Sequence, residues 1–296
     1  MPVVTIIVPF FGSTDELTRC LVSLDRQSIP ESAREIIVVD NGSGVDLSPL
    51  KLRFPAVRWL AEAQPGSYAA RNTGIRHASA PVIAFTDSDC VPASTWLAAG
   101  LDAMKKRGAP LLAGRVRYME PPTGRLNMYE SFEEHFFLLH RQEYLVARLN
   151  VSATANLFVL REVFEEVGFF ATDLMHYGDG EWTKRAVAGG KSLIYDGSAI
   201  VHHPRRSSFE EIRKKVRRVS GDTIMLVRRE QKGVITLAGA ILRHSIIDPR
   251  AHVRLVLYAF SASRFVVWPY IFGVRMSLTA TIEKTKVLFG GGVARL

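Results

Sequence analysis

The chain is 296 residues long, with 47% hydrophobic and 23% charged residues, a composition that supplies a substantial core and excludes wholesale disorder. Its formal net charge of +9 favours anionic partners, such as nucleotide phosphates or acidic lipid headgroups. Its two cysteines provide neither a disulfide framework nor a zinc-binding pattern, which is typical of a reducing compartment.

The first half of the chain alternates apolar runs with helical periodicity. We expect buried strands at Val3–Pro9, Glu35–Asp40, Val57–Leu60 and Pro81–Asp87, and helices at Asp15–Gln27 and Gly66–His77. This alternation predicts an α/β domain with a mostly parallel sheet and helices on both faces. In such sheets a ligand binds at the carboxyl ends of the strands, where this sequence places Asp40, Asp87 and Asp89.

The rest of the chain is less regular. We expect a helix at Tyr129–Asn150, a final strand within Ser192–His203, at Leu193–Tyr195 and Ala199–Val201, and a boundary near Arg205. Residues 1–205 then form the α/β domain, and residues 206–296 form a C-terminal helical extension. The N-terminus has neither a basic segment nor a small-residue cleavage site, so we expect no signal peptide and a cytoplasmic location.

The C-terminal extension concentrates basic charge. Between Arg205 and Lys232 there are ten Lys or Arg and four Asp or Glu residues. The segment Leu255–Leu278 is apolar, but its longest charge-free run, Phe265–Val274, is about half the ~20 residues that a spanning helix needs.

Two interpretations of this extension stay open. Residues 206–282 suit contact with an anionic membrane surface, which would make the protein peripheral at the inner face of the membrane. The alternative is a helix that packs on the α/β domain and exposes a solvated basic face. Nucleic acid is not an expected partner, because no recognised nucleic-acid-binding motif is present.

The acidic pair Asp87 and Asp89 directly follows the apolar run PVIAFT. Side chains at i and i+2 of a strand point to the same side, so both carboxylates can face one ligand. Paired carboxylates suit a hard divalent cation, Mg²⁺ or Mn²⁺, which keeps positions for phosphate oxygens and neutralises a diphosphate leaving group. An isolated Asp-x-Asp also occurs in solvated turns, so the pair alone leaves both interpretations open.

Two further charged residues lie in the same strand–helix pattern that leads to the Asp-x-Asp pair. Asp40 ends the second strand and could accept a hydrogen bond from a nucleotide base, and Arg71 on the next helix could pair with phosphate. Each alone also fits a plain turn or a surface charge. Their order along the chain with Asp87 and Asp89 indicates a nucleotide site.

Six stretches resemble the family 2 glycosyltransferases, which have the GT-A fold. They are VTIIVPFFG (4–12), EIIVVDNGS (35–43), GSYAARNTGI (66–75), IAFTDSDCVP (83–92), NLFVLREVFEEVGFF (156–170) and GDGEWTKRA (178–186). The resemblance implies a nucleotide-sugar-binding side at residues 1–110 and an acceptor side at residues 111–205. On the nucleotide side, Pro9 and Phe11 would line the pocket, Asp40 would hold the base, commonly uracil, and Arg71 would contact the nucleotide.

The resemblance also implies a metal site for Mn²⁺ or Mg²⁺. Asp87 and Ser88 would lie near the ribose and diphosphate, and Asp89 would be the main metal ligand, with Asp87 beside it. A histidine after the last strand often completes this site in GT-A enzymes, and His202 and His203 both follow Ala199–Val201. Imidazole is a reasonable Mn²⁺ ligand, and the sequence does not choose between the two histidines.

The stretch GDGEWTKR resembles the Glu-Asp-x-Asp-like motif that supplies the family's catalytic base. If Arg185 is the arginine that ends the motif, Asp179 takes the place of the base and Glu181 the following acidic place, whereas Gly178 replaces the usual leading Glu. That replacement leaves the choice between Asp179 and Glu181 open, and we favour Asp179. Asp179 would also be a good N-cap for the helix that follows.

The acceptor side is the least specific part of the resemblance. It places Asn156 near the sugar and makes His176, Tyr177 and Trp182 candidate acceptor contacts.

Together these implications describe an inverting, metal-dependent glycosyltransferase. It would move a sugar from a nucleotide-diphosphate sugar, with a UDP-sugar favoured, to a hydroxyl of a glycan or lipid-linked acceptor. A non-catalytic nucleotide or carbohydrate binder is the alternative, although both Asp89 and Asp179 are present. A nucleotidyltransferase would need a Lys- or Arg-bearing phosphate loop after the first strand, which Phe10–Thr14 lacks. A processive synthase is disfavoured because the sequence has no Q-x-x-R-W signature.

Overall fold

The computed structural model describes residues 1–229 and 267–288. Their contacts divide the chain into two compact units. The first comprises residues 1–119, 139–173 and 178–204, and the second comprises residues 120–138, 174–177 and the described part of 205–296. The domain boundary expected near Arg205 stays a prediction, and two segments that precede it in sequence belong to the second unit.

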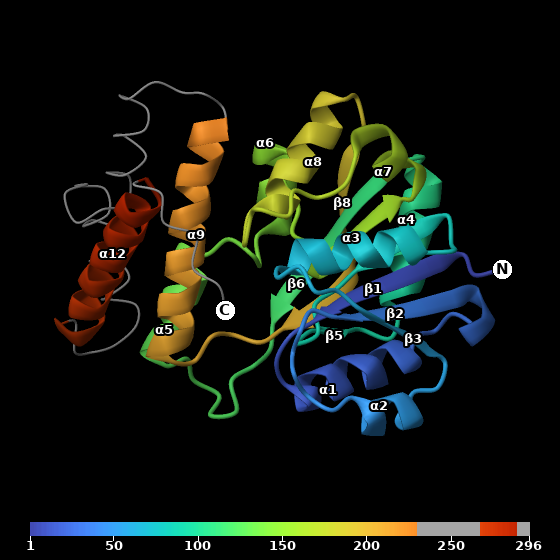
Figure 1. Ribbon diagram of the computed structural model, residues 1–296, viewed down its shortest axis with the longest axis horizontal. Helices are drawn as coiled ribbons and strands as arrows, with labels where there is room; N and C mark the ends of the chain where they lie inside the picture. The colour runs from blue at the N-terminus through green and yellow to red at the C-terminus, as the bar shows by residue number, and fades with distance from the viewer. Residues whose placement is uncertain (230–266, 289–296) are drawn as a thin grey trace. The chain divides into compact units, whose positions relative to one another are not determined.

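The first unit is built on one eight-stranded sheet with the order β3-β2-β1-β4-β7-β6-β8-β5 (Figure 1). Its strands are β1 Val4–Phe10, β2 Arg34–Asp40, β3 Val57–Ala61, β4 Val82–Phe85, β5 Val91–Pro92, β6 Leu111–Tyr118, β7 Leu157–Leu160 and β8 Leu193–His203. Strands β1 to β4 run parallel, so their carboxyl ends meet at one edge of the sheet. Strand β7 is antiparallel to both β4 and β6, which makes the sheet mixed beyond β4.

Strand β1 lies inside the sheet because its side chains are buried on both faces. Val4, Ile6 and Val8 enter one apolar cluster, whereas Ile7 enters a second cluster on the opposite face. Burial of each such side chain contributes about 1.5–3 kcal/mol. A strand that is covered on both sides has a continuous apolar sequence, which is why this strand could be predicted.

Helices cover both faces of this sheet, as the sequence predicted. The first cluster contains side chains of α1 Thr14–Asp25, α2 Ser48–Arg53 and α4 Trp96–Arg107, and the second contains side chains of α3 Ser67–His77, α7 Glu162–Val167 and α8 Gly178–Ala188. Helix α6, Gln142–Leu149, packs along β6 and β8. Two short 3₁₀ helices, η1 Glu31–Ala33 and η2 Thr154–Asn156, precede β2 and β7.

The single helix expected at Tyr129–Asn150 is wrong, because the segment forms two helices. Helix α5 spans Met128–Phe136, the backbone is extended at Phe137 (φ −109°, ψ 138°), and α6 begins at Gln142. The two halves also bury their apolar residues in different units: Phe132 of α5 belongs to the core of the second unit, whereas Leu145 of α6 is buried in the first. Helical periodicity alone could not indicate this change of core.

The second unit is helical within the described residues. It contains α5, α9 Phe209–Arg229 and α12 Val267–Leu288, which share one apolar cluster. The buried members of this cluster are Phe132, Ile212, Val216, Phe272, Met276 and Ala280. Ile212 and Val216 lie one turn apart on α9, so α5 and α12 help to cover this face of the helix.

None of the helices in residues 1–229 and 267–288 has the length and apolarity needed to span a bilayer. Of the apolar segment Leu255–Leu278, residues 255–266 lie outside the described residues, and the remainder belongs to α12.

Candidate active site

The Asp-x-Asp pair lies in a tight turn directly after β4. The carbonyl oxygen of Asp87 accepts a hydrogen bond from the backbone N–H of Cys90 at 3.1 Å, with Ser88 and Asp89 at the centre of the turn. Such a turn directs neighbouring side chains toward one point more closely than a continuing strand would. Both aspartates are half-buried, whereas Cys90 is buried.

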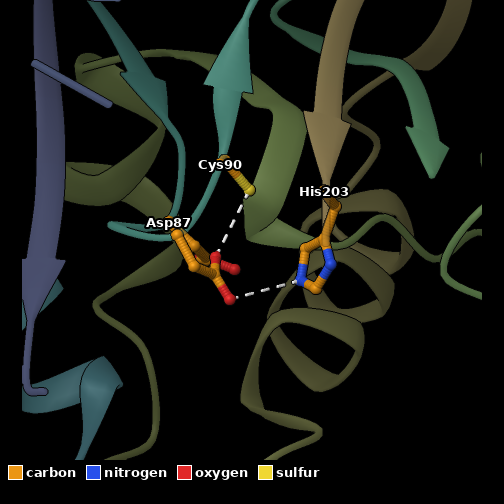
Figure 2. Close-up of side chains that lie close together, drawn as sticks. Asp87, Cys90 and His203 are labelled. Atoms are coloured by element: carbon orange, nitrogen blue, oxygen red, sulfur yellow. Dashed lines mark hydrogen bonds and ion pairs between the residues drawn. The ribbon is translucent and has the colours of Figure 1, made fainter. Parts of the chain in front are cut away.

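Four side chains that could hold a metal ion gather at this turn: Asp87, Asp89, Cys90 and His203. One donor atom from each lies within 4.8 Å of all the others. His203 Nε2 is 3.9 Å from Asp89 Oδ2, and Cys90 Sγ is 3.6 Å from Asp89 Oδ1. Figure 2 shows the labelled side chains of Asp87, Cys90 and His203 converging from the turn and from the end of β8.

The sheet determines which of the two histidines joins this cluster. Strand β5 pairs with β8 so that Val91 lies opposite His202, and the ring of His202 contacts the Val91 carbonyl through Nδ1 at 3.2 Å. His203 points to the other side and is buried. Its Nδ1 lies 2.5 Å from the Pro204 carbonyl oxygen, which can only accept, so Nδ1 donates there and Nε2 is the ring atom that faces Asp89.

The donor set fits a divalent cation. Carboxylate oxygens suit Mg²⁺ and Mn²⁺, and a neutral imidazole whose other nitrogen is hydrogen-bonded is a common ligand for transition metals. The half-buried aspartates also face solvent, which leaves room for oxygen atoms of a substrate.

Arg71 connects this cluster to the rest of the site. It lies on α3, is 3% exposed, and its guanidinium forms an ion pair with Asp87 Oδ1. The same guanidinium lies over the ring of Tyr68, 5.5 Å from its centre. Its Nε is buried and has no hydrogen-bond partner within residues 1–229 and 267–288. A buried guanidinium with donor capacity beyond its ion pair is suited to a phosphate-bearing ligand.

The start of α3 is held by the segment after β2. The Asn41 amide donates to the carbonyls of Glu62 and Gln64, at 3.0 and 2.8 Å, and its oxygen accepts from the Gly66 N–H at 2.7 Å. Gly66 has φ 124°, a conformation that favours glycine, so the chain can turn directly into α3 and its Arg71.

Asp179 lies in the first turn of α8 and is held by three donors of the first unit. Its Oδ2 accepts from the Thr154 N–H at 3.0 Å, its Oδ1 accepts from the Gly180 N–H at 2.8 Å, and the Tyr68 hydroxyl donates to the carboxylate. Burial raises the pKa of Asp179 above its ordinary value, although these hydrogen bonds and the charge of Arg71 act to lower it. The net effect is a carboxyl group with increased proton affinity, as expected of a general base.

The position of Gly178 shows why the usual leading glutamate of the Glu-Asp-x-Asp-like motif would not fit in this chain. A Cβ at this position would come within 2.7 Å of the Tyr68 ring, so a larger side chain would collide with it. Tyr68 is buried beside Phe170 and donates to Asp179. The ring thus occupies the space that a leading side chain would need.

Glu181 has a different environment from Asp179. It pairs with Arg185 one turn later, at 3.0 Å, and Arg185 also donates to the carbonyls of Val167 and Phe169. This arrangement braces the end of α7 against α8.

The expected nucleotide-side residues lie at the carboxyl ends of β1 and β2. Pro9 is buried in β1, opposite Val39, whereas Phe11 follows β1 and is 50% exposed. Asp40 ends β2, and its Oδ1 accepts from the Ser43 N–H at 2.9 Å, which leaves its second oxygen for other contacts.

Two of the expected acceptor residues are core residues in the structure. Asn156 is fully buried; its oxygen accepts from Trp96 Nε1 at 2.8 Å and its amide donates to the carbonyls of Arg115 and Ala199. Trp182 is also fully buried and donates to the Gly168 carbonyl at 2.7 Å. These side chains shape the sheet and α8 from inside, and neither presents its polar atoms to an acceptor.

The other two, His176 and Tyr177, belong to the second unit. Their backbone N–H groups donate to Asp222 Oδ2 of α9, at 2.6 and 3.0 Å, as does the Met175 N–H at 3.0 Å. Burial lowers the pKa of His176 well below its ordinary value, and the neighbouring charge of Lys215 acts in the same direction. Asp222 therefore fixes the segment that leads into α8.

Sequence reasoning missed Tyr68, Thr154 and Asp222. Tyr68 lies within a stretch that carried the resemblance, so its aromatic ring three residues before Arg71 was a usable signal. Thr154 contributes its backbone N–H to Asp179, and Asp222 accepts from N–H groups that are distant in sequence. Residue type gives no signal for either contact.

Comparison with known proteins shows the family and the fold of this chain. The family model described as glycosyl transferase family 2 matches residues 5–168. The glycosyltransferase AglE of Haloferax volcanii is 36% identical over 251 residues, which are 82% of this chain and 81% of that protein. The pre-mycofactocin glycosyltransferase of Mycobacterium tuberculosis is 26% identical over 214 residues, 70% of this chain and 44% of the relative.

Solved structures show the same fold. The mannosyltransferase PcManGT from Pyrobaculum calidifontis, in complex with GDP-Man and Mn²⁺, gives a TM-score of 0.63 at 19% identity, over 97% of this chain and 87% of that one. TarS from S. aureus, in complex with UDP, gives 0.55 at 14% identity, over 98% of this chain and 92% of that one. The family match and the relative from Haloferax volcanii together show that the chain belongs to glycosyltransferase family 2, and that it is a glycosyltransferase with the GT-A fold.

Proposed function

We propose that the protein is an inverting, metal-dependent glycosyltransferase. It transfers a sugar from a nucleotide-diphosphate sugar, with a UDP-sugar favoured, to a hydroxyl of a glycan or lipid-linked acceptor. The observation that carries the proposal is the position of Arg71, which pairs with Asp87 of the cation cluster and whose charge also acts on Asp179. The cation cluster and the candidate base Asp179 thus both interact electrostatically with one buried arginine.

On the donor side, Asp89, Asp87 and His203 would hold a Mn²⁺ or Mg²⁺ ion. When bound, such an ion supplies positive charge that neutralises the departing diphosphate. Arg71 adds a fixed positive charge next to Asp87, and Ser88 lies at the centre of the same turn. Asp40, at the end of β2, would hold the base, and Pro9 and Phe11, at the end of β1, would line the nucleotide pocket.

The solved structures of this fold support a nucleotide-sugar donor with either guanine or uracil as its base. PcManGT was solved with GDP-Man and TarS with UDP, and both have the fold of this chain. We favour a UDP-sugar because the acidic residue at the end of β2, Asp40, matches the family position that commonly holds uracil.

On the acceptor side, Asp179 takes the proton of the attacking hydroxyl. Burial raises the pKa of its carboxyl, which improves proton affinity, while the N–H groups of Thr154 and Gly180 hold its orientation. The deprotonated oxygen attacks the anomeric carbon from the face opposite the diphosphate, so a single displacement inverts its configuration. Glu181 is the weaker candidate because Arg185 already pairs with it.

Metal-dependent nucleotide binding tests the donor half of this proposal. Titration calorimetry with UDP and GDP, with and without Mn²⁺, should give binding that requires the ion. Asp89→Asn should remove the ion-dependent part, and Asp15→Asn, which changes a carboxylate in the first turn of α1, is the matched control. Equal binding by wild type and Asp89→Asn in Mn²⁺ would overturn the proposed cation site.

A glycan or lipid-linked acceptor forms the second part of the proposal. The basic helix α9, on which Lys214 is exposed and Arg213 and Arg217 are half-buried, supports a lipid-linked acceptor at an anionic membrane surface. Such a helix would be attracted to anionic lipid by about 1 kcal/mol per basic residue near the surface. Flotation with phosphatidylglycerol vesicles at low salt should carry the protein upward, and with neutral vesicles it should not. Protein that stays at the bottom with both would contradict membrane contact.

A further inference from the structure

Cys90 is part of the cation cluster, although the proposed reaction does not require a thiol there. It follows Asp89 in the same turn, it is buried, and its Sγ lies 3.6 Å from Asp89 Oδ1. Together with Asp87, Asp89 and His203 it completes a set of two oxygens, one nitrogen and one sulfur, and Figure 2 shows its side chain on the same side of the turn as His203.

The spacing of these donors resembles that of a tetrahedral zinc site. Zinc–sulfur and zinc–nitrogen or –oxygen bonds of about 2.3 and 2.1 Å place neighbouring ligand atoms about 3.4–3.6 Å apart. Cys90 Sγ lies 3.6 Å from Asp89 Oδ1, and His203 Nε2 lies 3.9 Å from Asp89 Oδ2. Since all the donor atoms lie within 4.8 Å of one another, side-chain adjustment would bring them onto one ion without a change of the backbone.

The chemistry of the set favours a different ion from the one that supports transfer. Oxygen ligands suit Mg²⁺ and Mn²⁺, whereas a thiolate with an imidazole selects Zn²⁺ and its softer analogue Cd²⁺, and Zn²⁺ also ranks far above Mn²⁺ in general affinity. We propose that Cys90 is a ligand in the cation site and that it makes the site bind Zn²⁺ or Cd²⁺ in preference to Mn²⁺ or Mg²⁺, so that these thiophilic ions displace the catalytic cation.

The coordination step is balanced without any redox partner. The thiol proton of Cys90 leaves to solvent as the sulfur–metal bond forms, because a coordinated thiol is deprotonated by the ion. His203 can offer Nε2 to the ion while its Nδ1 keeps the contact with the Pro204 carbonyl. No electrons are exchanged in this step.

The competing explanation is that Cys90 is simply a buried apolar side chain. Cys90 packs in the first cluster with Cys20, which is also buried and donates to the Asp87 carbonyl at 3.6 Å. Cys20 does not belong to the donor group, although it has the same chemistry and similar burial. Because the chain has two cysteines in all, Cys20→Ser is a complete matched control for Cys90→Ser.

Cadmium binding to the full chain tests the inference, with a phosphine as the reductant and without any sugar substrate. Wild type and Cys20→Ser should develop the ultraviolet charge-transfer band of a cadmium–thiolate bond as one Cd²⁺ binds, and Cys90→Ser should not. Cd²⁺ or Zn²⁺ should release bound Mn²⁺, which electron paramagnetic resonance detects. Cys90→Ser should weaken Cd²⁺ binding by about tenfold or more while changing Mn²⁺ binding by less than about threefold.

Three results would overturn the inference: a band that persists in Cys90→Ser, a band that is lost in Cys20→Ser, or wild type that binds Mn²⁺ through Asp89 yet shows no band with Cd²⁺. The inference rests on the proposed cation site, and Mn²⁺ binding separates the two, because a wild type that binds neither ion refutes the site itself. If Cys90→Ser does not fold, cadmium NMR of the wild type decides, since the chemical shift reports whether sulfur is coordinated.

Discussion

Asp179 combines burial with several hydrogen-bond donors, and this combination suits a base better than either property alone. Burial alone would favour the protonated form, and donors alone would make the carboxylate too weak a base. In this site the N–H groups of Thr154 and Gly180 stabilise the anion while burial keeps the pKa raised. Glu181 has instead an ion pair with Arg185, which fixes it in a bracing role.

Replacement of these two carboxylates separates the roles. Asp179→Asn should lower the rate of sugar transfer by about 10²–10⁴-fold, because a general base contributes about that much. Glu181→Gln should lower it far less, and both variants should bind the nucleotide like wild type. The measurement is kcat with the identified donor, and a larger loss in Glu181→Gln would transfer the role of base to Glu181.

The pH dependence of the rate follows from the raised pKa of Asp179. The base is active when deprotonated, so kcat/KM should rise with pH through that pKa, at a higher pH than an ordinary aspartate would give. Tyr68→Phe removes a hydroxyl that donates to the carboxylate and should therefore move this rise to still higher pH. A profile that is unchanged in Tyr68→Phe would show that the hydroxyl does not act on the base.

The charged residues that the sequence singled out lie together in the structure, whereas one of the polar residues does not join them. Asp89 and Asp87 belong to one group of donor atoms, and Arg71 pairs with Asp87. Asn156 could not be placed correctly, because a buried amide satisfies its hydrogen bonds inside the core as readily as with a sugar. The choice between His202 and His203 depended on β-sheet register, which sequence does not contain.

At the scale of elements, helix α8 begins at Gly178, which packs against the ring of Tyr68. Alanine is favoured over glycine in a helix by about 1 kcal/mol, but overpacking in a core costs about 1–3 kcal/mol. Since a Cβ at Gly178 would lie 2.7 Å from the Tyr68 ring, we expect the packing cost to prevail. Gly178→Ala should therefore lower the free energy of unfolding, as measured by urea denaturation. Gly190→Ala would be a poor control because of its positive φ, whereas Lys184→Ala on the exposed face of α8 is suitable.

Helix α9 fixes the segment before α8 through one carboxylate. Asp222 accepts three backbone N–H groups, from Met175, His176 and Tyr177. Asp222→Ala would leave these partly buried donors without their acceptor, so we expect a loss of about 1–3 kcal/mol of stability, whereas Asp222→Asn keeps an acceptor oxygen and should lose less. Thermal unfolding should give this order, with the exposed Lys214→Ala on the same helix unchanged. Equal stability of all three variants would contradict the role of Asp222.

Strands and helices could be predicted where a single hydrophobic pattern runs through the whole element. Strands β1, β2 and β4 are buried on both faces and have continuous apolar sequences. Strand β5 is two residues long and β7 is antiparallel within an otherwise helical stretch, so neither has a period that sequence could show. The break between α5 and α6 follows from a change of core, which is a long-range property.

At the scale of the whole molecule, the proposed cation site at one edge of the sheet and the proposed base on α8 lie in the first unit. The family membership fixes the reaction class as sugar transfer. The net charge of +9 is consistent with anionic substrates and with an acidic surface, and does not distinguish them.

The most direct test of the central claim is nucleotide release from a panel of UDP- and GDP-sugars, with Mn²⁺ present or chelated, by wild type, Asp89→Asn and Asp179→Asn. We expect the wild type to release nucleotide from one donor, and only when Mn²⁺ is present. Asp89→Asn should lose both nucleotide release and nucleotide binding. Asp179→Asn should lose nucleotide release but keep nucleotide binding. Release that is independent of Mn²⁺, or that persists in Asp179→Asn at the wild-type rate with an acceptor present, would contradict the central claim.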